Sequence, residues 1–282
     1  MKLVRFGPIG EERPGLIDPS GGIRDLSGEI GDVAGDALSD AALDRLRGLD
    51  VETLPPVEGT PRLGPCVGSV GKVVCIGLNY SDHAAEAGMD VPPEPIVFMK
   101  ATSALCGPDD GIELPRGSTA TDWEVELAVV IGRHAKNIAE AEAFDHIAGY
   151  SILNDVSERD FQIRHSGQWV KGKSHDTFGP LGPWLVTRDE VPDPQILPLH
   201  LDLNGTRMQE GTTATMVYSV AFLVAYLSRF MSLHPGDVIA TGTPPGVGMG
   251  QKPDPVYLKP GDRLDLGIAG LGTQRQTVRA SA

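Results

Sequence analysis

Cysteines, basic residues and long apolar runs are all scarce in this chain of 282 residues. The three cysteines, Cys66, Cys75 and Cys106, are odd in number and are not spaced like paired metal ligands. Neither a disulfide framework nor a structural zinc site is therefore expected. Because sparse, unpaired cysteines fit a reducing compartment, we expect a cytoplasmic protein.

Basic residues are too few to balance the acidic ones. The chain has 24 Lys and Arg against 38 Asp and Glu, which gives a formal net charge of −14. This charge repels the phosphates of nucleic acids and anionic lipids, so neither is an expected partner. An anionic substrate would also be repelled at long range, so a site for one needs its own cationic side chains or a metal ion.

No stretch of the sequence is apolar for long enough to cross a membrane. Glu11, Glu12 and Arg13 come too early for a signal peptide at the N-terminus. The most apolar later run, residues 216–227, is too short for a membrane span and contains Ser219. We expect this run to form a buried helix.

Proline divides the chain into two parts. Residues 1 to about 50 predict a small lobe that includes a helix at about 39–46. Residues 52–68 then carry four prolines, which is typical of a linker. We therefore expect a small N-terminal lobe with its linker over residues 1–68 and a larger domain over residues 69–282.

Short apolar runs recur along the larger domain and predict strands at 73–76, 96–99, 127–131, 150–153, 199–203 and 238–240. Asn204-Gly205 supplies the positive φ angles that a tight hairpin requires. Pro-Gly-Asp turns at 235–237 and 260–262 each precede a strand-like stretch, which predicts antiparallel hairpins near the C-terminus. The larger domain is thus expected to be rich in strands.

Three carboxylates alternate with apolar residues just before a five-residue apolar run. A strand over this segment would place Asp122, Glu124 and Glu126 on one face. Like charges so close together are costly beside a buried run unless water or a cation screens them. A divalent metal would resolve this conflict, with Asp155 at the end of the 150–153 run as a further ligand. A solvated outer face of a sheet is the alternative explanation.

A second pair of titratable residues follows the 73–76 run. Ser81 or Asp82 can cap a short helix here. His83 and Glu86 then lie three positions apart on one face of that helix. The helix dipole disfavours a protonated His83 in the first turn, and Glu86 could orient the ring, as a general base requires. A solvent-exposed pair on a surface helix is the alternative.

Two polar loops offer groups that could hold an anion. Lys171 and Lys173 supply local cations, unless they are simply a solvated pair. The run Thr-Gly-Thr-Pro-Pro-Gly-Val-Gly at 241–248 offers hydroxyls and backbone amides suited to a carboxylate, with a purely structural turn as the alternative. It lacks the Gly-Lys-Ser ending of a phosphate-binding loop, so a nucleotide site is not expected.

Five segments, in this order, resemble motifs of the fumarylacetoacetate hydrolase family over most of residues 71–275. They are Ile76-Gly-Leu-Asn-Tyr-Ser-Asp-His-Ala-Ala-Glu86, Asp122-Trp-Glu-Val-Glu-Leu127, Asn154-Asp-Val-Ser-Glu-Arg-Asp-Phe-Gln162, Lys171-Gly-Lys-Ser174 and Thr241-Gly-Thr-Pro-Pro-Gly-Val-Gly248. The resemblance implies an α+β, mainly β fold, a mixed β-roll with few helices that carries a small N-terminal α+β lobe. It also implies a homodimer.

The resemblance assigns roles to nine residues. Three would hold a Mg²⁺ or Mn²⁺ ion: Glu124, Glu126 and Asp155. Three would act on the substrate, as a catalytic dyad and as a lysine at the reacting oxygen: His83, Glu86 and Lys173. Three match positions that line the substrate site in relatives: Arg159, Gln162 and Thr243. Asp122 matches its motif in a supporting role.

The function that this resemblance implies is hydrolysis of a carbon–carbon bond. The substrate would be a 2,4-dioxo acid, either an acylpyruvate or a 2,4-dioxo-3-deoxy sugar acid, and the products pyruvate and a carboxylic acid. The residues within these motifs look most like those of hydrolases that act on such sugar acids in L-fucose or L-rhamnose breakdown.

Two other functions remain open. Oxaloacetate decarboxylation and hydroxy-dienedioate isomerisation share an enolate with the hydrolysis, so the same scaffold supports them. A non-catalytic, metal-dependent carboxylate-binding protein is a further alternative. The pairing of His83 with Glu86 argues against it, because a binding protein has no need of a general base.

Overall fold

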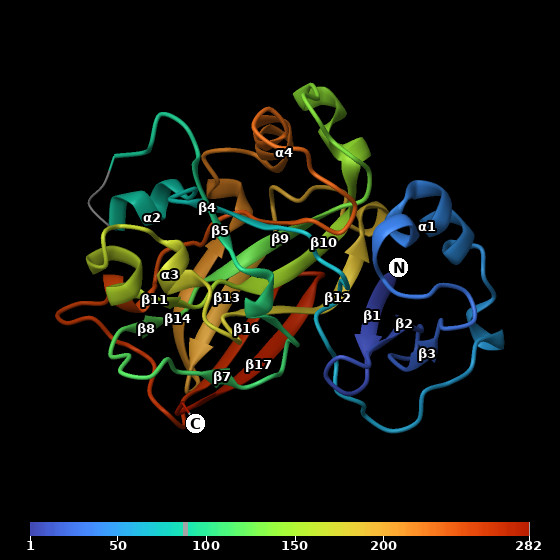
Figure 1. The fold of residues 1–282 in the computed structure, drawn as a ribbon, viewed down its shortest axis with the longest axis horizontal. Coiled ribbons are helices and arrows are strands. Elements are labelled where there is room, and N and C mark those ends of the chain that lie inside the picture. Colours follow the sequence, from blue (N-terminus) through green and yellow to red (C-terminus); the bar gives the residue numbers. More distant parts are fainter. Residues whose placement is uncertain (87–89, 282) are drawn as a thin grey trace.

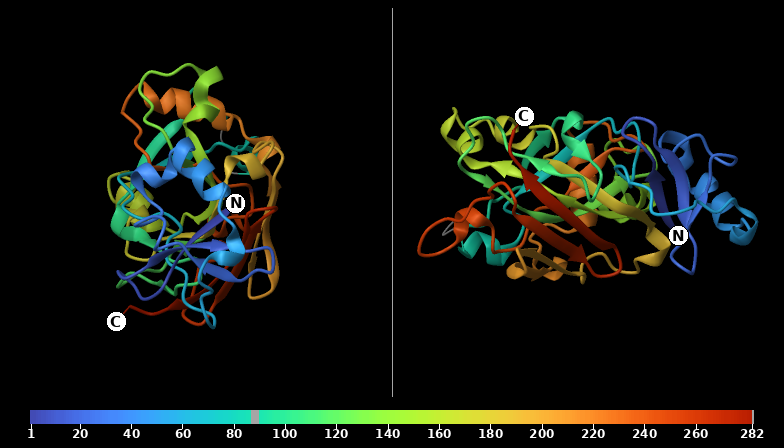
Figure 2. Two further views of the ribbon diagram at one scale, coloured as in Figure 1. Left: turned by 90° about the vertical axis from the view of Figure 1, so that its right-hand side faces the viewer. Right: turned by 90° about the horizontal axis from the view of Figure 1, so that it is seen from below.

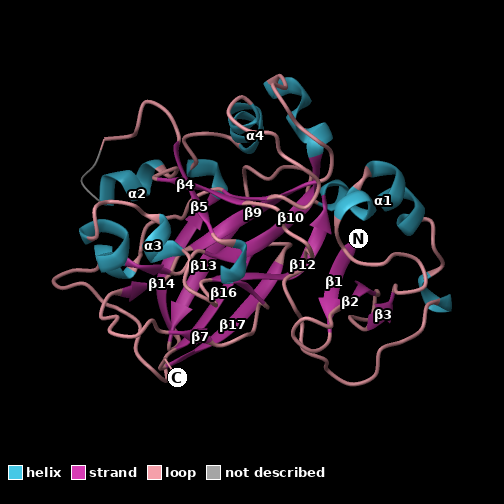
Figure 3. Ribbon diagram, viewed as in Figure 1, coloured by secondary structure: helices cyan, strands magenta, loops and turns pink. Residues whose placement is uncertain are grey.

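The computed structural model describes residues 1–86 and 90–281, with the side chains of residues 83–85 outside the described part (Figure 1). Strands fill the centre of the molecule, and short helices lie around them (Figure 3). The α+β, mainly β fold predicted from the sequence is thus confirmed. Within the described residues, no helix is both long and apolar enough to cross a membrane.

A ten-stranded sheet runs through both lobes of the molecule. In spatial order its strands are β3 (Ile23–Asp25), β2 (Arg13–Ile17), β1 (Lys2–Phe6), β12 (Gly179–Thr187), β10 (Ile147–Asn154), β9 (Val125–Ile131), β15 (Val238–Ala240), β4 (Val73–Gly77) and β5 (Ile96–Lys100), with β6 (Leu105–Cys106) paired to β12 beside this path. β1 pairs antiparallel with β12, so the N-terminal lobe extends the sheet of the larger domain (Figure 2). The boundary at residue 68 stays a prediction.

A second sheet packs against one face of the first. Its order is β14 (Thr206–Thr212), β13 (Pro198–Leu203), β16 (Arg263–Ile268), β17 (Gly272–Arg279) and β7 (Ile112–Glu113), and a separate pair joins β8 (Thr121–Asp122) to β11 (Ser157–Glu158). The α-helices are α1 (Asp40–Arg47), α2 (Ser81–Glu86), α3 (Val170–Lys173) and α4 (Val220–Ser228). A π-helical turn covers Asp160–Arg164. Short 3₁₀ turns cover Gly35–Leu38, Val51–Thr53, Thr102–Ala104, Glu140–His146, Arg188–Glu190, Thr213–Thr215 and Gly248–Gly250.

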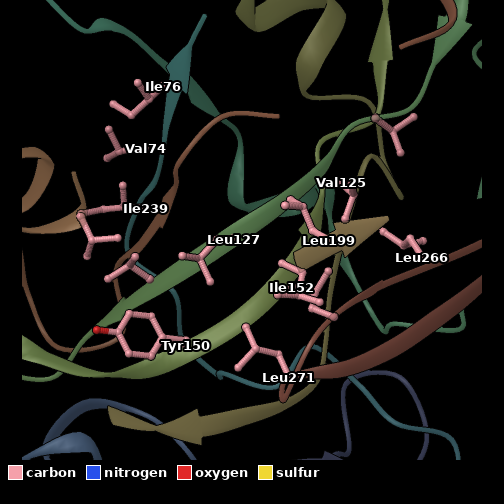
Figure 4. Close-up of a cluster of buried hydrophobic side chains, with 14 of the residues drawn as sticks. Val74, Ile76, Val125, Leu127, Tyr150, Ile152, Leu199, Ile239, Leu266 and Leu271 are labelled. Atoms are coloured by element: carbon pink, nitrogen blue, oxygen red, sulfur yellow. The ribbon is translucent and has the colours of Figure 1, made fainter. Parts of the chain in front are cut away.

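Strand β9 is buried on both faces, because its side chains alternate between two apolar cores. Leu127 and Val129 belong to the core that the five-stranded sheet and α4 share (Figure 4). Ala128 and Val130 belong to the core that the N-terminal lobe covers on the other face. Glu126 is the next residue in this second row. A carboxylate therefore stands where the second apolar row ends.

Most of the predicted elements are confirmed. All six apolar runs are strands, and the run 216–227 supplies all but the last residue of the buried helix α4. Asn204 and Gly205 turn β13 into β14 with φ angles of 52° and 80°. The hairpin predicted after the turn at 235–237 is wrong. The strand that follows, β15, lies between β9 and β4 and pairs parallel with β4.

A chain of buried amide side chains connects the second sheet to the acidic segment. Gln274 lies on β17, and its Nε2 is 2.9 Å from the carbonyl oxygen of Ile152 on the first sheet. Gln276 donates to Gln274 Oε1 at 2.9 Å and accepts from Asn154 Nδ2 at 3.1 Å. Asn154 Oδ1 in turn accepts from the backbone N–H of Glu124 at 3.1 Å. The relay therefore fixes the backbone on which Glu124 stands.

Replacing Gln276 with Leu tests this relay. The substitution leaves the Nδ2 of Asn154 and the Oε1 of Gln274 buried without this partner. We expect the free energy of unfolding, measured by urea titration, to fall by about 1–3 kcal/mol. The matched change at the exposed Gln168 should stay within about 0.5 kcal/mol of the wild type. Equal losses for the two variants would contradict a structural role for the relay.

Candidate metal centre and active site

Three carboxylates meet where β9 begins and β10 ends. Glu124 directly precedes β9, Glu126 lies within it, and Asp155 directly follows β10, which pairs antiparallel with β9. The backbone N–H of Asp155 donates to the carbonyl oxygen of Glu124 at 2.9 Å. One oxygen from each carboxylate lies within 4.8 Å of the others, and the three residues are 6%, 2% and 0% exposed. The fold therefore brings these three acids together, as the sequence predicted.

Buried cations surround this triad unevenly. Lys173 Nζ lies 2.7 Å from Glu124 Oε2 and 2.8 Å from Asp155 Oδ2. Lys100 Nζ lies 2.5 Å from Asp155 Oδ1, and Arg159 Nη2 lies 2.7 Å from Glu124 Oε1. The carboxylate of Glu126 accepts the backbone N–H of Gly242 at 2.8 Å, and no ion pair to it is found among the described residues. Two acids of the triad are thus neutralised while the third is not.

This asymmetry separates the pKa values of the two glutamates. Burial alone would raise the pKa of Glu124, but the charges of Lys173 and Arg159 outweigh it and lower that pKa to about 2. Burial raises the pKa of Glu126 well above its usual value, and the negative charges of Asp155 and Glu124 raise it further. A divalent cation among the three acids would supply the positive charge that Glu126 lacks.

The donor set fits a hard divalent cation. Mg²⁺ and Mn²⁺ prefer oxygen ligands, and the triad offers only carboxylate oxygens. Since the triad is buried, water alone cannot screen the repulsion between the acids. We infer that Glu124, Glu126 and Asp155 could hold such an ion. The alternative of a solvated outer face does not fit acids that are almost fully buried.

Asp122 is not part of the triad, although the alternating pattern predicted that it would share a face with Glu124 and Glu126. The strand is broken, because β8 ends at Asp122 and β9 begins only at Val125. The Asp122 carboxylate instead accepts the backbone N–H groups of Gly248 at 2.6 Å and Met249 at 2.9 Å. It also lies 2.8 Å from Arg159 Nε, so it ties this arginine to the glycine-rich loop.

Glu124 and Glu126 of the triad line a cavity of about 520 Å³, and we call this acidic part of the lining the floor. This cavity is lined by every predicted site residue whose side chain is described, apart from Asp155: Glu86, Glu124, Glu126, Arg159, Gln162, Lys173 and Thr243. Glu86, on α2, accepts the backbone N–H of Gly246 at 3.1 Å. The predicted partner of Glu86 in the dyad, His83, has a side chain outside the described residues.

Like Arg159, the other two predicted substrate residues already have partners within the protein. Gln162 Oε1 accepts from Arg159 Nη1 at 3.0 Å. The Thr243 hydroxyl donates to the carbonyl oxygen of Val125 at 2.9 Å and accepts from Gln209 Nε2 at 2.8 Å. These contacts hold the rim of the cavity in place, and they leave Gln162 its amide N–H groups for a ligand.

Sequence reasoning missed Lys100. This lysine ends β5 after the apolar run 96–99, and its side chain is fully buried against Asp155 and the carbonyl oxygen of Val156. The only signal was a lysine directly at the end of an apolar run, which is equally typical of a strand that enters solvent. Its partner lies 55 positions away in the sequence, and only the fold reveals it.

The fold and the site together define a class of protein in which a buried carboxylate triad underlies a cavity of substrate size. The chain belongs to the fumarylacetoacetate hydrolase family, whose model, described as "Fumarylacetoacetate (FAA) hydrolase C-terminal", matches residues 72–279. A Burkholderia multivorans protein described as a hydrolase is 64% identical over 281 residues and 100% of each chain.

Two similar solved structures carry different activities in their names. The 2-hydroxyhepta-2,4-diene-1,7-dioate isomerase from Mycobacterium marinum is 34% identical, with a TM-score of 0.75 over 100% of this chain and 99% of that one. The maleylpyruvate hydrolase from Sphingobium sp. SYK-6, in complex with manganese(II) and pyruvate, is 29% identical, with a TM-score of 0.81 over 100% of each chain. The family thus includes both hydrolases and isomerases.

Replacing Glu126 with Gln tests the triad as a metal site. The amide oxygen can still accept the Gly242 N–H, and the buried acid without an ion pair is removed. We therefore expect the variant to be at least as stable as the wild type in chelator. Mn²⁺ at about 100 times its Kd should raise the free energy of unfolding of the wild type by about 2.7 kcal/mol, and the variant should lose most of this gain. Urea titrations in chelator measure the stability of the two proteins, and titrations with Mn²⁺ measure the gain from the metal. Glu140→Gln, at an exposed position, is the control.

Replacing Lys100 with Met tests the role of the missed lysine. The variant keeps the volume of the side chain but leaves the charge of Asp155 without one of its two cations. Breaking a buried ion pair in this way should lower the free energy of unfolding in chelator by about 3–5 kcal/mol. The exposed Lys171→Met should change it by less than about 0.5 kcal/mol. If both variants unfold at the same urea concentration, Asp155 does not depend on Lys100.

Proposed function

We propose that this protein is a metal-dependent hydrolase that cleaves a 2,4-dioxo acid of the acylpyruvate class into pyruvate and a carboxylic acid. The observation that carries this proposal is the buried triad of Glu124, Glu126 and Asp155, with Lys173 beside it, in the floor of a cavity of about 520 Å³. A similar structure was solved with manganese(II) and pyruvate, which is one product of the proposed reaction.

The triad and its cations are suited to the 2-oxo acid end of such a substrate. A bound Mg²⁺ or Mn²⁺ ion would supply Lewis acidity to the carboxylate and 2-oxo oxygens of the substrate. Lys173 is held at the triad by Glu124 and Asp155, and their charges keep its pKa above the usual value despite burial. Its ammonium group therefore stays charged and can donate to the oxygen on which negative charge develops.

The hydrolytic step requires a general base near C4, the carbonyl carbon that water attacks. His83, oriented by Glu86, would take a proton from water, and the resulting hydroxide adds to the C4 carbonyl carbon. The C3–C4 bond then breaks, its electron pair forms the enolate of pyruvate, and C4 leaves as the carboxylic acid. Protonation of C3 completes pyruvate. The Gly246 amide holds Glu86 at the cavity, where it could orient His83.

Isomerisation of a hydroxy-dienedioate is the second candidate, because an isomerase is among the similar structures. This reaction also passes through an enolate at the 2-oxo end, because the 2-hydroxyl loses a proton and a carbon of the diene gains one, but it needs no hydroxide at C4. Oxaloacetate decarboxylation would require only the 2-oxo acid end of the site. A homodimer and a cytoplasmic location stay predictions.

Pyruvate release from a panel of 2,4-dioxo acids tests the proposal. The panel holds acetylpyruvate, benzoylpyruvate and a 2,4-dioxo-3-deoxy sugar acid, each with Mg²⁺, Mn²⁺ or chelator. We expect metal-dependent pyruvate together with the matching carboxylic acid in equal amounts. No release from any member, with a hydroxy-dienedioate or oxaloacetate consumed instead, would overturn hydrolysis in favour of that other activity.

Replacing His83 with Ala tests the assigned base. Loss of general-base catalysis should lower kcat by about 10²–10⁴-fold. The triad is unchanged, so Mn²⁺ affinity, measured by calorimetric titration, should stay within about twofold of the wild type. Unchanged turnover would remove His83 from the mechanism, whereas lost metal affinity would place it in the metal site.

A further inference from the structure

One wall of the cavity is apolar, in contrast to its floor. Phe98 on β5 and Trp169, just before α3, meet edge to face, with ring centroids 5.2 Å apart and planes at 62°. Further aliphatic side chains line the same cavity: Ile76, Leu78, Ile96, Ile163, Val247 and Met249. Most of the surface that lines the cavity is apolar, so a ligand that fills the space must present apolar surface to it.

The wall begins at the reacting end of the cavity. Lys173 Nζ lies 4.9 Å from the ring centroid of Phe98, so one face of this ring is next to the ammonium group at the triad. Phe98 in turn contacts Trp169, which continues the aromatic surface of the same cavity. A substrate whose 2-oxo acid end lies at the triad would therefore place its acyl end along the two rings.

Gly77 allows the indole to occupy this position. It is the last residue of β4, and a Cβ added to it would lie only 2.7 Å from a ring carbon of Trp169. The absence of a side chain at Gly77 lets the indole lie directly against the strand. The wall is thus a packed feature of the fold, because strand, ring and neighbouring ring fit together.

Among the described residues, few groups along this wall could bind hydroxyls. The Thr243 hydroxyl is committed to Val125 and Gln209, and the carbonyl oxygen of the Gln162 amide is committed to Arg159. The described charged side chains that line the cavity belong to the triad, to the cations bound to it or to Glu86, with one exception. That exception is Lys252, which is exposed. A chain with several hydroxyls would leave most of them without partners, and this lowers affinity.

We propose that Phe98 and Trp169 make this enzyme selective for 2,4-dioxo acids with an apolar acyl group, either aromatic or a longer alkyl chain. This inference rests on the proposed function and narrows its substrate class. The sugar acid that the resemblance of the motifs implied would then be a poor substrate. One methylene in a hydrophobic pocket changes kcat/KM by roughly 10–200-fold, so the selectivity should be easy to measure.

The test compares kcat/KM for benzoylpyruvate, acetylpyruvate and the 3-deoxy sugar acid. The wild type should prefer benzoylpyruvate to each of the others by at least about tenfold. Trp169→Ala should lower kcat/KM by at least about tenfold for benzoylpyruvate and by less than about threefold for acetylpyruvate, whose acyl end carries only a methyl group. Val170→Ala, at the next position and outside the cavity lining, is the matched control and should leave both values unchanged. Preference for the sugar acid, or equal losses for both acylpyruvates, would overturn the inference.

A second variant and a binding measurement keep the test decisive. Ile163 is 49% exposed, so Ile163→Asn should fold even if Trp169→Ala does not, and it should also lower the preference for benzoylpyruvate. Calorimetric titration of the Mn²⁺-loaded protein with both acylpyruvates measures selectivity without turnover. If no dioxo acid is hydrolysed but benzoylpyruvate binds at least about tenfold tighter, the proposed function fails and the apolar wall stands. If acetylpyruvate is hydrolysed as fast and bound as tightly as benzoylpyruvate, the proposed function stands, but the apolar wall does not determine which substrate is preferred.

Discussion

The structure depends on keeping four carboxylates buried at the ends of neighbouring strands. Each would be costly alone in an apolar interior, and together they repel one another. Asp122 is balanced by Arg159 and backbone amides, and Asp155 by two lysines, whereas the described residues offer Glu126 only the backbone N–H of Gly242. The cations come from β5, α3 and the segment that follows β11, so this charge balance is what brings those distant segments together around the cavity floor.

The two-faced burial of β9 explains where the site forms. A strand covered on both sides needs apolar residues at every position, and residues 125 and 127–131 obey this rule. Glu126 breaks it on the face where small residues otherwise meet the N-terminal lobe. Because Lys100 and Lys173 neutralise the neighbouring acids Asp155 and Glu124, the interruption of the apolar row becomes a polar pocket inside the molecule and not a defect in the core.

The sequence predicted this fold well wherever a signal was local. Apolar runs marked the central strands, Asn204-Gly205 marked a hairpin, and acids at alternate positions marked Glu124 and Glu126. It failed for Asp122, because alternation assumes one continuous strand, and the break between β8 and β9 depends on amides more than 120 positions away. It missed Lys100 and Trp169 for a related reason. Their roles come from contacts with Asp155 and Gly77, which no pattern within a short window can reveal.

The floor of the cavity and part of its apolar wall are carried by different kinds of segment. The triad stands on central strands that the glutamine and asparagine relay ties to the second sheet, whereas Trp169 and Met249 come from connecting segments at the rim. Side chains in connecting segments can be exchanged with little effect on the strands beneath them. Such an arrangement separates the evolution of substrate choice from that of bond cleavage: a lineage could acquire new substrates by altering the rim while the charge cluster below stays as it is.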